Sequence, residues 1–200
     1  MEYAYGNWVL VIVNIVIFLI FIIGSFRPQS KTDWHSFNLI ATFIISLFVE
    51  MYGFPLTIYV LVSLFSSRFP NLNFSHSSGH LLIDVFGIKG DPHTNLIHLI
   101  SNALIFGGLI LLSSAWRTLY QSQQFGKLAT SGVYQYFRHP QYIAFIIMII
   151  GFLLQWPTII TLLMAPILIF RYIRLGKKEE EDMIKIYGQE YLSYIKNTLF

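Results

Sequence analysis

Long stretches of apolar residues alternate with short polar connections along this chain. The first stretch, residues 8–26, contains no charged residue and is close to the roughly 20 residues that cross the hydrocarbon core of a bilayer. Further apolar stretches cover residues 37–65, 94–116, 143–155 and 158–170. The pattern predicts an all-α fold: a polytopic integral membrane bundle of about five transmembrane helices, followed by a C-terminal amphipathic cytosolic helix.

Prolines and polar residues divide these stretches. Within residues 37–65, Pro55 is expected to break or kink the helix, and Gly53 weakens it further. Pro157 separates the last two stretches and allows a tight helical hairpin between them. Residues 66–93 are rich in Ser, Asn, Gly and Pro, which is typical of a loop outside the bilayer.

The segment from Gly176 onward is charged and amphipathic, unlike the rest of the chain. It predicts a helix with one polar and aromatic face, because five residues recur at a spacing close to 3.6. These residues are Glu180, Ile184, Tyr187, Tyr191 and Tyr194. Two interpretations stay open: a helix on the membrane surface with solvated acids, or a helix whose consecutive glutamates face a cationic partner, because anionic lipid would repel them.

Composition supports a membrane protein and narrows its chemistry. Apolar residues make up 55% of the chain and charged residues 12%, whereas a soluble domain carries roughly a quarter charged residues. The absence of cysteine excludes disulfides, thiolate metal sites and a cysteine nucleophile. The first stretch lacks a basic leader and a small-residue cleavage site, so we expect a retained helix rather than a signal peptide. No nucleic-acid partner is expected.

The basic residues indicate an orientation. With five spans, every Lys and Arg except Arg68 and Lys89 falls on the same side of the bilayer. Positively charged connections mark the cytoplasmic side. We therefore expect the N-terminus outside and the C-terminus in the cytoplasm.

The most informative motif is "GVYQYFRHPQY", residues 132–142, at the start of the fourth apolar stretch. After the hairpin come the pair Glu179-Glu180 and then "YGQEYLSY", residues 187–194. This ordered set, within residues 126–196, resembles the superfamily of isoprenylcysteine carboxyl methyltransferases and phospholipid methyltransferases. The shared pattern is Gly-x-Tyr, Arg-His-Pro-x-Tyr, a glutamate pair, an aromatic-Gly pair and two tyrosines. Ala144 stands where the superfamily often has glycine.

The resemblance implies a membrane-embedded methyltransferase that binds S-adenosylmethionine on the cytosolic face and releases S-adenosylhomocysteine. The chain has no Gly-x-Gly-x-x-Gly, so a dinucleotide-type fold is not available. Pro140 can start a helix whose free N–H groups attract an anion, and Arg138 can add a bidentate pair. Together they would hold the methionine carboxylate; the alternative for Arg138 is snorkelling to lipid phosphate.

Glu180, with Glu179 as second choice, is expected to contact the cofactor ammonium or ribose. The hypothesis requires Glu180 and Arg138 to lie on the same side of the bilayer. For His139, contact with the cofactor and capping of the preceding loop are both open. Gly132 is expected to permit a tight turn close to the ligand. Four tyrosines are expected to wall the cofactor, the last two by closing over the adenosine: Tyr134, Tyr142, Tyr187 and Tyr191.

Glu50 is the one carboxylate inside a predicted span. Such residues usually face protein and often serve function, so Glu50 is a candidate catalytic residue in a cavity that admits the acceptor. The alternative is a protonated or paired structural glutamate. Under the first hypothesis, replacement by glutamine abolishes activity without unfolding.

Four histidines raise a metal or haem alternative: His76, His80, His93 and His98. Nothing else in the sequence supports a metal site, and none is predicted. We expect a single domain over residues 1–200, with residues 1–125 shaping the acceptor pocket and residues 126–200 holding the cofactor motif, the hairpin and the tail.

The function hypothesis is methyl transfer to a small or lipophilic acceptor that enters from membrane lipid, with carboxyl (isoprenylcysteine-like) or thiol acceptors favoured. Phospholipid amine N-methylation is the enzymatic alternative. A non-catalytic membrane sensor or haem-associated protein that retains the fold is the other.

Overall fold

A computed structural model describes residues 5–65, 67, 79–82 and 94–200 of the chain. Its helices are α1 (Trp8–Phe26), α2 (Lys31–Phe48), α3 (Leu56–Phe65), α5 (Leu96–Gln124), α6 (Pro140–Gln155), α7 (Ile159–Tyr187) and α8 (Gln189–Ile195). A π-helical turn, η1 (Val49–Gly53), follows α2, and a 3-10 turn, η3 (Gly132–Gln135), precedes α6. The helical membrane bundle expected from the sequence is confirmed. Most of the expected loop 66–93, including His76 and His93, lies outside the described residues.

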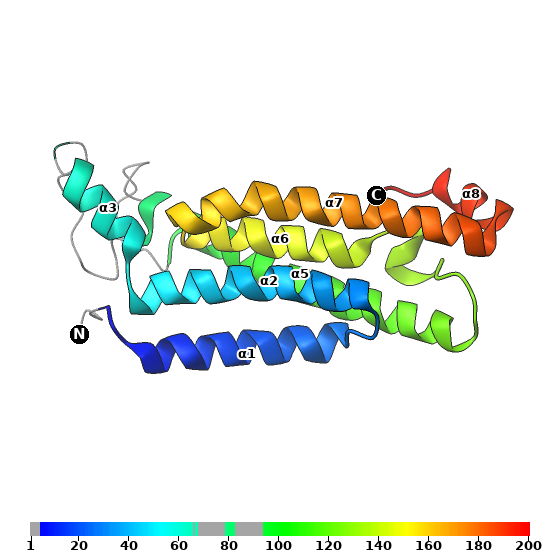
Figure 1. Ribbon diagram of the computed structural model, residues 1–200, viewed down its shortest axis with the longest axis horizontal. Helices are drawn as coiled ribbons and strands as arrows, with labels where there is room; N and C mark the ends of the chain where they lie inside the picture. Colours follow the sequence, from blue (N-terminus) through cyan, green and yellow to red (C-terminus); the bar gives the residue numbers. More distant parts are fainter. Residues whose placement is uncertain (1–4, 66, 68–78, 83–93) are drawn as a thin grey trace.

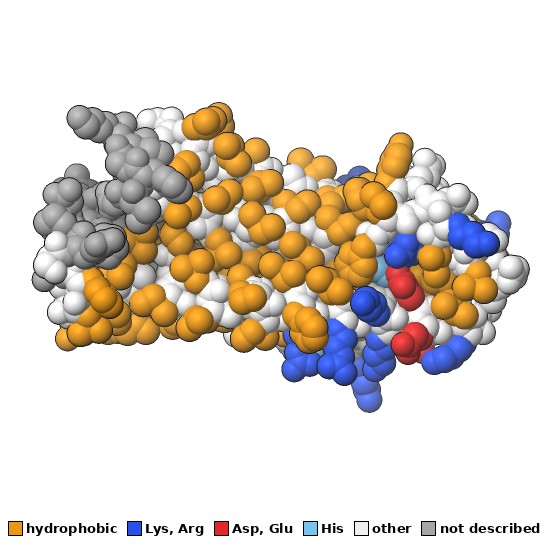
Figure 2. Space-filling view, turned by 90° about the horizontal axis from the view of Figure 1, so that it is seen from above, with side chains coloured by type: hydrophobic (Ala, Val, Ile, Leu, Met, Phe, Trp, Pro, Cys, Tyr) orange, Lys and Arg blue, Asp and Glu red, His pale blue; other side chains and the backbone are white. Residues whose placement is uncertain are grey.

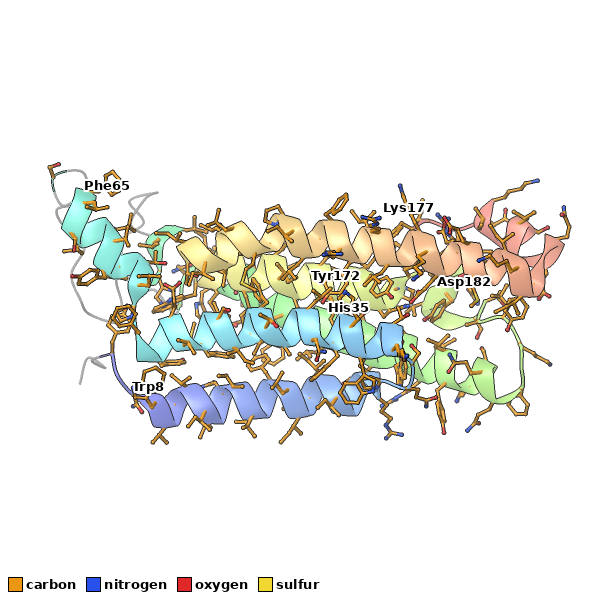
Figure 3. The ribbon with its side chains drawn as sticks, viewed as in Figure 1. Trp8, His35, Phe65, Tyr172, Lys177 and Asp182 are labelled. Atoms are coloured by element: carbon orange, nitrogen blue, oxygen red, sulfur yellow. The ribbon has the colours of Figure 1, made fainter. Side chains whose placement is uncertain are left out.

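The helices α1, α2, α5, α6 and α7 run side by side along the long axis, with α3 at one end and α8 at the other (Figure 1). Apolar side chains cover most of the length of the bundle, and charged side chains gather towards the α8 end (Figure 2). In the interior of the bundle, Tyr172 links α7 to α2. The Tyr172 hydroxyl donates to the Ser36 carbonyl of α2 at 3.0 Å. Trp8 and Phe65 mark the α3 end, and Asp182 the other (Figure 3).

Among the described residues, four segments are long and apolar enough to cross a membrane: α1, α2 together with η1, α5 and α7. The fifth expected span, α6, is apolar but has 16 residues, or about 24 Å at 1.5 Å per residue. It packs most extensively against α5. Small residues bring these two helices together, as is common in membranes: a Cβ on Gly108 would lie 2.5 Å from the Met148 side chain and 3.0 Å from the Ala144 carbonyl oxygen.

The second apolar stretch is divided, as the proline in it predicts. After η1, residues Phe54 and Pro55 leave the helical path, and α3 turns away from the bundle axis (Figure 1). Pro55 has no N–H to donate to a preceding turn. Residues 37–65 therefore form one span plus a short separate helix rather than one kinked helix.

The tail differs from the sequence expectation in where it begins and ends. Instead of a new helix near Gly176, α7 continues without a break from the apolar stretch to Tyr187. One glycine costs a helix only about 1 kcal/mol, and good helix formers follow it. The break comes at Gly188, which has φ +53°, a conformation that favours glycine. The polar and aromatic face expected from the sequence is thus divided between α7 and α8. Glu180 lies on the part of α7 that continues beyond its apolar stretch.

Candidate functional site

The loop before α6 is fixed by the C-terminal strap, which we define as residues 195–200. The strap lies alongside the loop: the Arg138 N–H donates to the Leu199 carbonyl, and the Leu199 N–H donates to the Tyr136 carbonyl, each at 2.8 Å. Earlier in the loop, Gly132 has φ +58°, and a Cβ there would lie 3.1 Å from the Thr118 hydroxyl. The expected tight turn at Gly132 is present and lies against α5.

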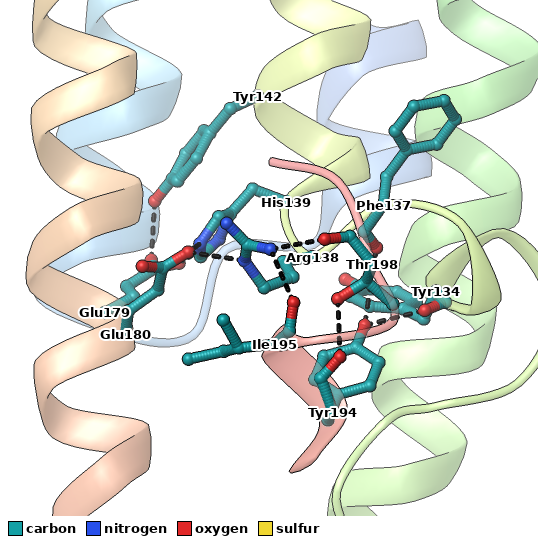
Figure 4. A network of polar contacts seen from close by, with 10 residues as sticks. All are labelled: Tyr134, Phe137, Arg138, His139, Tyr142, Glu179, Glu180, Tyr194, Ile195 and Thr198. Carbon is teal, nitrogen blue, oxygen red and sulfur yellow. Dashed lines mark hydrogen bonds and ion pairs between the residues drawn. The ribbon is translucent and has the colours of Figure 1, made fainter. Parts of the chain in front are cut away.

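Arg138 and Glu180 meet at the start of α6. The Arg138 Nε donates to the Glu180 Oε1 at 2.6 Å, and the two side chains are 15% and 20% exposed. The Arg138 Nη1 donates to two strap carbonyls, those of Ile195 at 3.3 Å and Thr198 at 2.6 Å (Figure 4). Residues 42 positions apart thus form a partly buried, charge-assisted contact. The proximity that the sequence hypothesis requires is observed.

His139 lies between the two glutamates. Its Nδ1 is 3.4 Å from the Glu179 Oε2, and its Nε2 is 3.3 Å from the Glu180 Oε1, with the ring 4% exposed. It occupies the N-cap position of α6, but its side chain makes no capping hydrogen bond. Gly176 makes room for the ring, because a Cβ there would lie 3.0 Å from the His139 Cδ2 and 2.9 Å from the Phe200 ring.

Tyrosine hydroxyls complete the polar network. Tyr142 donates to the Glu179 Oε1 at 2.5 Å, Tyr134 to the Gln141 Oε1 at 3.0 Å, and Tyr194 to the Tyr134 carbonyl at 2.7 Å. Burial raises the pKa of Tyr134, and the nearby Glu179 raises that pKa further. Burial also raises the pKa of Tyr194 to about 12. Both hydroxyls therefore stay protonated and able to donate at neutral pH.

A cavity of about 510 Å³ lies beside this network, within the range of roughly 300–1,000 Å³ that is usual for small-molecule sites. The start of α2, the end of α5, the loop before α6, the end of α7 and α8 all contribute to its wall. The wall contains charged groups of both signs and four phenol rings. The acids are Asp33, Glu179 and Asp182; the bases are Lys127, Arg138 and His139; the rings are Tyr134, Tyr187, Tyr191 and Tyr194.

The structure gathers all but one of the site residues expected from the sequence. Six of them line the cavity: Tyr134, Arg138, His139, Glu179, Tyr187 and Tyr191. Two others contact these residues: Glu180 accepts a hydrogen bond from Arg138, and Tyr142 donates one to Glu179. Pro140 begins α6, as predicted.

Glu50 is not part of this site. It lies in η1, at the end of α2 away from the cavity, and is 3% exposed. The 18 residues of α2 separate it from Ser30 by about 27 Å at 1.5 Å per residue. Its Oε2 accepts a hydrogen bond from the Thr57 N–H at 2.9 Å, which is a contact that supports the turn from η1 into α3.

The two described histidines of the metal alternative lie at the end of the bundle that holds Gln155. The His80 Nδ1 is 3.0 Å from the Gln155 carbonyl oxygen, and the rings of His80 and His98 are 5.6 Å apart. Within the described part of the chain, no three His, Asp or Glu side chains gather as a metal site would require.

Sequence reasoning missed several members of the site. Tyr194 shares the stripe of Glu180 and Tyr191, so its periodicity was a usable signal. Asp33 carried only the signal of a helix start, because it forms a capping box with Ser30. The strap carbonyls carried no signal, since every residue has a backbone carbonyl.

Comparison with known proteins identifies the segment that contains the site. Residues 96–190 match the family described as Phospholipid methyltransferase. A stretch of 72 residues, 36% of this chain, is 37% identical to the human Protein-S-isoprenylcysteine O-methyltransferase and spans 25% of that protein's length. No solved structure matches. The motifs and both matches therefore confirm the resemblance of this chain to the superfamily of isoprenylcysteine carboxyl methyltransferases and phospholipid methyltransferases.

Proposed function

We propose that this protein is an integral-membrane methyltransferase that transfers a methyl group from S-adenosylmethionine to a small or lipophilic acceptor. The observation that carries the proposal is the Arg138–Glu180 pair, whose Nε and Oε1 are 2.6 Å apart at the wall of the cavity. It joins the start of a buried helix to the cytosolic extension of α7.

The chemistry of the cavity wall fits S-adenosylmethionine. Among the described residues, the Arg138 Nη2 has no hydrogen-bond partner, so it is free to bind the methionine carboxylate. Glu179 and Asp33 can accept from the ammonium and the ribose hydroxyls. Tyr187 and Tyr191 can wall the adenine, and phenol faces favour the sulfonium cation.

The observed pairing changes the role proposed for one residue. Glu180 accepts from Arg138 and lies near His139, so we propose that it orients both side chains rather than contacting the cofactor alone. Glu179 then becomes the first choice for the cofactor ammonium. Its Oε1 accepts from the Tyr142 hydroxyl, and its Oε2, 3.4 Å from the His139 Nδ1, has a second lone pair that can accept from the ammonium.

S-adenosylmethionine supplies an electrophilic methyl group. A lone pair of the acceptor forms the new bond to the methyl carbon while the carbon–sulfur bond breaks and its electrons neutralise the sulfonium. With a carboxylate or thiolate acceptor, opposite charges cancel and no proton is transferred. A cavity that excludes water does not oppose such a step, and positioning supplies much of the rate enhancement. Carboxyl or thiol acceptors are favoured.

Phospholipid amine methylation is the second candidate. The description of the matching family favours it, and His139 lies beside two carboxylates that can pair with its protonated form. A protonated amine must lose a proton to a base before it attacks. Turnover that depends on an ionisable base, with His139 essential, would therefore indicate nitrogen chemistry.

The first test is cofactor binding. Calorimetry on the detergent-purified protein should detect S-adenosylhomocysteine binding, and Arg138→Ala should weaken it by about tenfold or more, the usual cost of a charged hydrogen bond. Arg171→Ala, which removes an exposed arginine of α7, is the matched control and should bind normally. A protein that shows a haem absorbance band but no S-adenosylhomocysteine binding would instead be the non-catalytic alternative.

The second test is the acceptor. Labelled methyl transfer should be compared for prenyl-cysteine, a lipophilic thiol and phosphatidylethanolamine in the same vesicles. Transfer to prenyl-cysteine or the thiol supports the main proposal. Transfer to phosphatidylethanolamine alone would replace it with the amine reaction.

A further inference from the structure

A second polar cavity lies between the end of α1 and α5. Its volume is about 300 Å³, and none of its lining residues belongs to the cavity of the candidate site. On α5 it is lined by Ser113, Trp116, Arg117 and Tyr120, which follow the i, i+3, i+4, i+7 spacing of one helix face. On the other side it is lined by the last turn of α1 and the residue that follows, with Gly24, Ser25 and Arg27.

The wall of this cavity offers a hydroxyl donor to a ligand. Trp116 lines the cavity and is 5% exposed, but its indole Nε1, which has no hydrogen-bond partner among the described residues, is covered by neighbouring atoms and does not open into the cavity. The ring itself is held by the Phe26 ring, 4.9 Å away. Beside it, the Ser113 hydroxyl donates to the Ser25 hydroxyl at 2.8 Å, so the Ser25 hydroxyl hydrogen remains available.

The charge of this cavity is positive. Arg27 and Arg117 both line it, and no carboxylate does. In the part of the chain that the structure describes, neither guanidinium makes an ion pair. The C-terminal end of α1 carries partial negative charge, which two full positive charges outweigh. Arginine forks match the geometry of phosphate oxygens.

We propose that the α1–α5 cavity binds a phosphate group, carried by a membrane phospholipid. Arg27 and Arg117 pair with the phosphate oxygens, and the Ser25 hydroxyl donates to the same group. Arginines at a membrane edge often only snorkel to the headgroups. Snorkelling needs no cavity, whereas here both arginines and the Ser25 hydroxyl line one cavity.

The position of the cavity suits a lipid. The C-terminal end of α1 and Arg117 of α5 lie on the same side of the predicted bilayer as Arg138, where headgroups are found. The apolar outer face of α1, which includes Ile17, Ile20 and Phe21, continues from the cavity towards the bilayer core and can receive the acyl chains. The site is thus separate from the proposed methyl-transfer site, and its test does not depend on that activity.

The test is native mass spectrometry of the full chain in detergent with dioleoyl phosphatidic acid, and with dioleoylglycerol as the probe that lacks phosphate. We expect one phosphatidic acid to bind more tightly than dioleoylglycerol. The double variant Arg27→Gln/Arg117→Gln should lose about tenfold or more in phosphatidic acid affinity. The matched control Arg171→Gln/Arg174→Gln, which removes two exposed arginines of α7, should bind as the wild type does.

Ser25→Ala removes only one hydroxyl from the wall of the cavity. It should weaken phosphatidic acid binding several-fold and leave dioleoylglycerol binding unchanged, which separates the loss of the donor from a folding defect. Competition by inorganic phosphate distinguishes the two sources of the group: displacement of the lipid assigns the site to phosphate in general, and no displacement assigns it to the lipid. Equal retention of phosphatidic acid by wild type and the Arg27/Arg117 double variant, or equal binding of both lipids, overturns the proposal.

Discussion

At the scale of single residues, Arg138 is the point on which three parts of the chain converge. Its guanidinium donates to a carboxylate of α7 and to two carbonyls of the strap. The backbone N–H of Arg138 donates to a third strap carbonyl. A lysine could not reproduce this arrangement, because an ammonium lacks the planar fork of donors. The side chain is therefore oriented before any ligand arrives, which lowers the ordering cost of binding.

The orienting role of Glu180 gives the first prediction. Glu180→Gln should weaken S-adenosylhomocysteine binding roughly tenfold, because the charge-assisted contact that fixes Arg138 becomes a neutral one. Calorimetry measures the effect. Glu181→Gln, at the adjacent exposed position, is the control. Equal affinities of the two variants would show that Glu180 has no special role.

Glu50 gives a prediction that reverses the sequence-based expectation. Because α2 separates it from the candidate site and a glutamine can still accept from the Thr57 N–H, Glu50→Gln should keep S-adenosylhomocysteine affinity and turnover within about twofold, the scatter usual for a site with no contact to the ligand. The thermal unfolding midpoint should change little. Loss of turnover in a folded protein would restore the hypothesis that Glu50 acts in an acceptor cavity.

At the scale of elements, the site depends on one long helix and one short strap. Because α7 continues through Gly176, the register of its buried part determines where Glu179 and Glu180 point. The break at Gly188 then returns the chain through α8, so that Tyr194 and the strap reach the loop before α6. Two backbone hydrogen bonds between Leu199 and the loop close the arrangement.

The strap can be tested by removing one backbone donor. Leu199→Pro deletes the N–H that donates to the Tyr136 carbonyl, and it should weaken S-adenosylhomocysteine binding several-fold, because a hydrogen bond contributes about 0.5–1.5 kcal/mol. Leu199→Ala keeps the N–H and shortens the exposed side chain. It should bind like the wild type. If both variants lose affinity equally, the Leu199 side chain rather than the backbone pairing holds the loop.

At the scale of the whole molecule, the surface of the bundle is apolar along most of its length and charged at one end. Charged side chains gather at the α8 end, and α3 lies at the other end (Figures 1 and 2). The candidate site is lined by the end of α7 and by α8, and the α1–α5 cavity by the end of α1, whereas Glu50 lies in η1, before α3. A single bilayer orientation would therefore place both proposed ligand sites on the cytoplasmic side, where basic residues concentrate.

The absence of cysteine makes this orientation testable. Single cysteines can be introduced at two exposed positions, Lys196→Cys in the strap and Thr94→Cys before α5. In intact cells, a membrane-impermeant thiol reagent should label Thr94→Cys and reach Lys196→Cys only after the membrane is opened. The reverse pattern would place the candidate site outside the cell.

Much of the bundle follows from local physics that the sequence displays. The apolar stretches predict the membrane-crossing helices because hydrophobicity and length act within each segment. Pro55 and Pro140 mark a break and a helix start for equally local reasons. Which side chains belong together was indicated instead by the resemblance to the methyltransferase superfamily, carried by the ordered motifs in residues 126–196.

Only the tertiary structure decided which of those side chains contact one another. The ion pair of Arg138 with Glu180 and the hydrogen bonds of the strap to the loop join residues 42 to 63 positions apart. Contacts at that separation depend on helix register, on the turn at Gly188 and on the room left by Gly176. Packing also placed Glu50 at the far end and brought Trp116 of α5 against the last turn of α1. Local propensity determines segments, and only packing determines which segments meet.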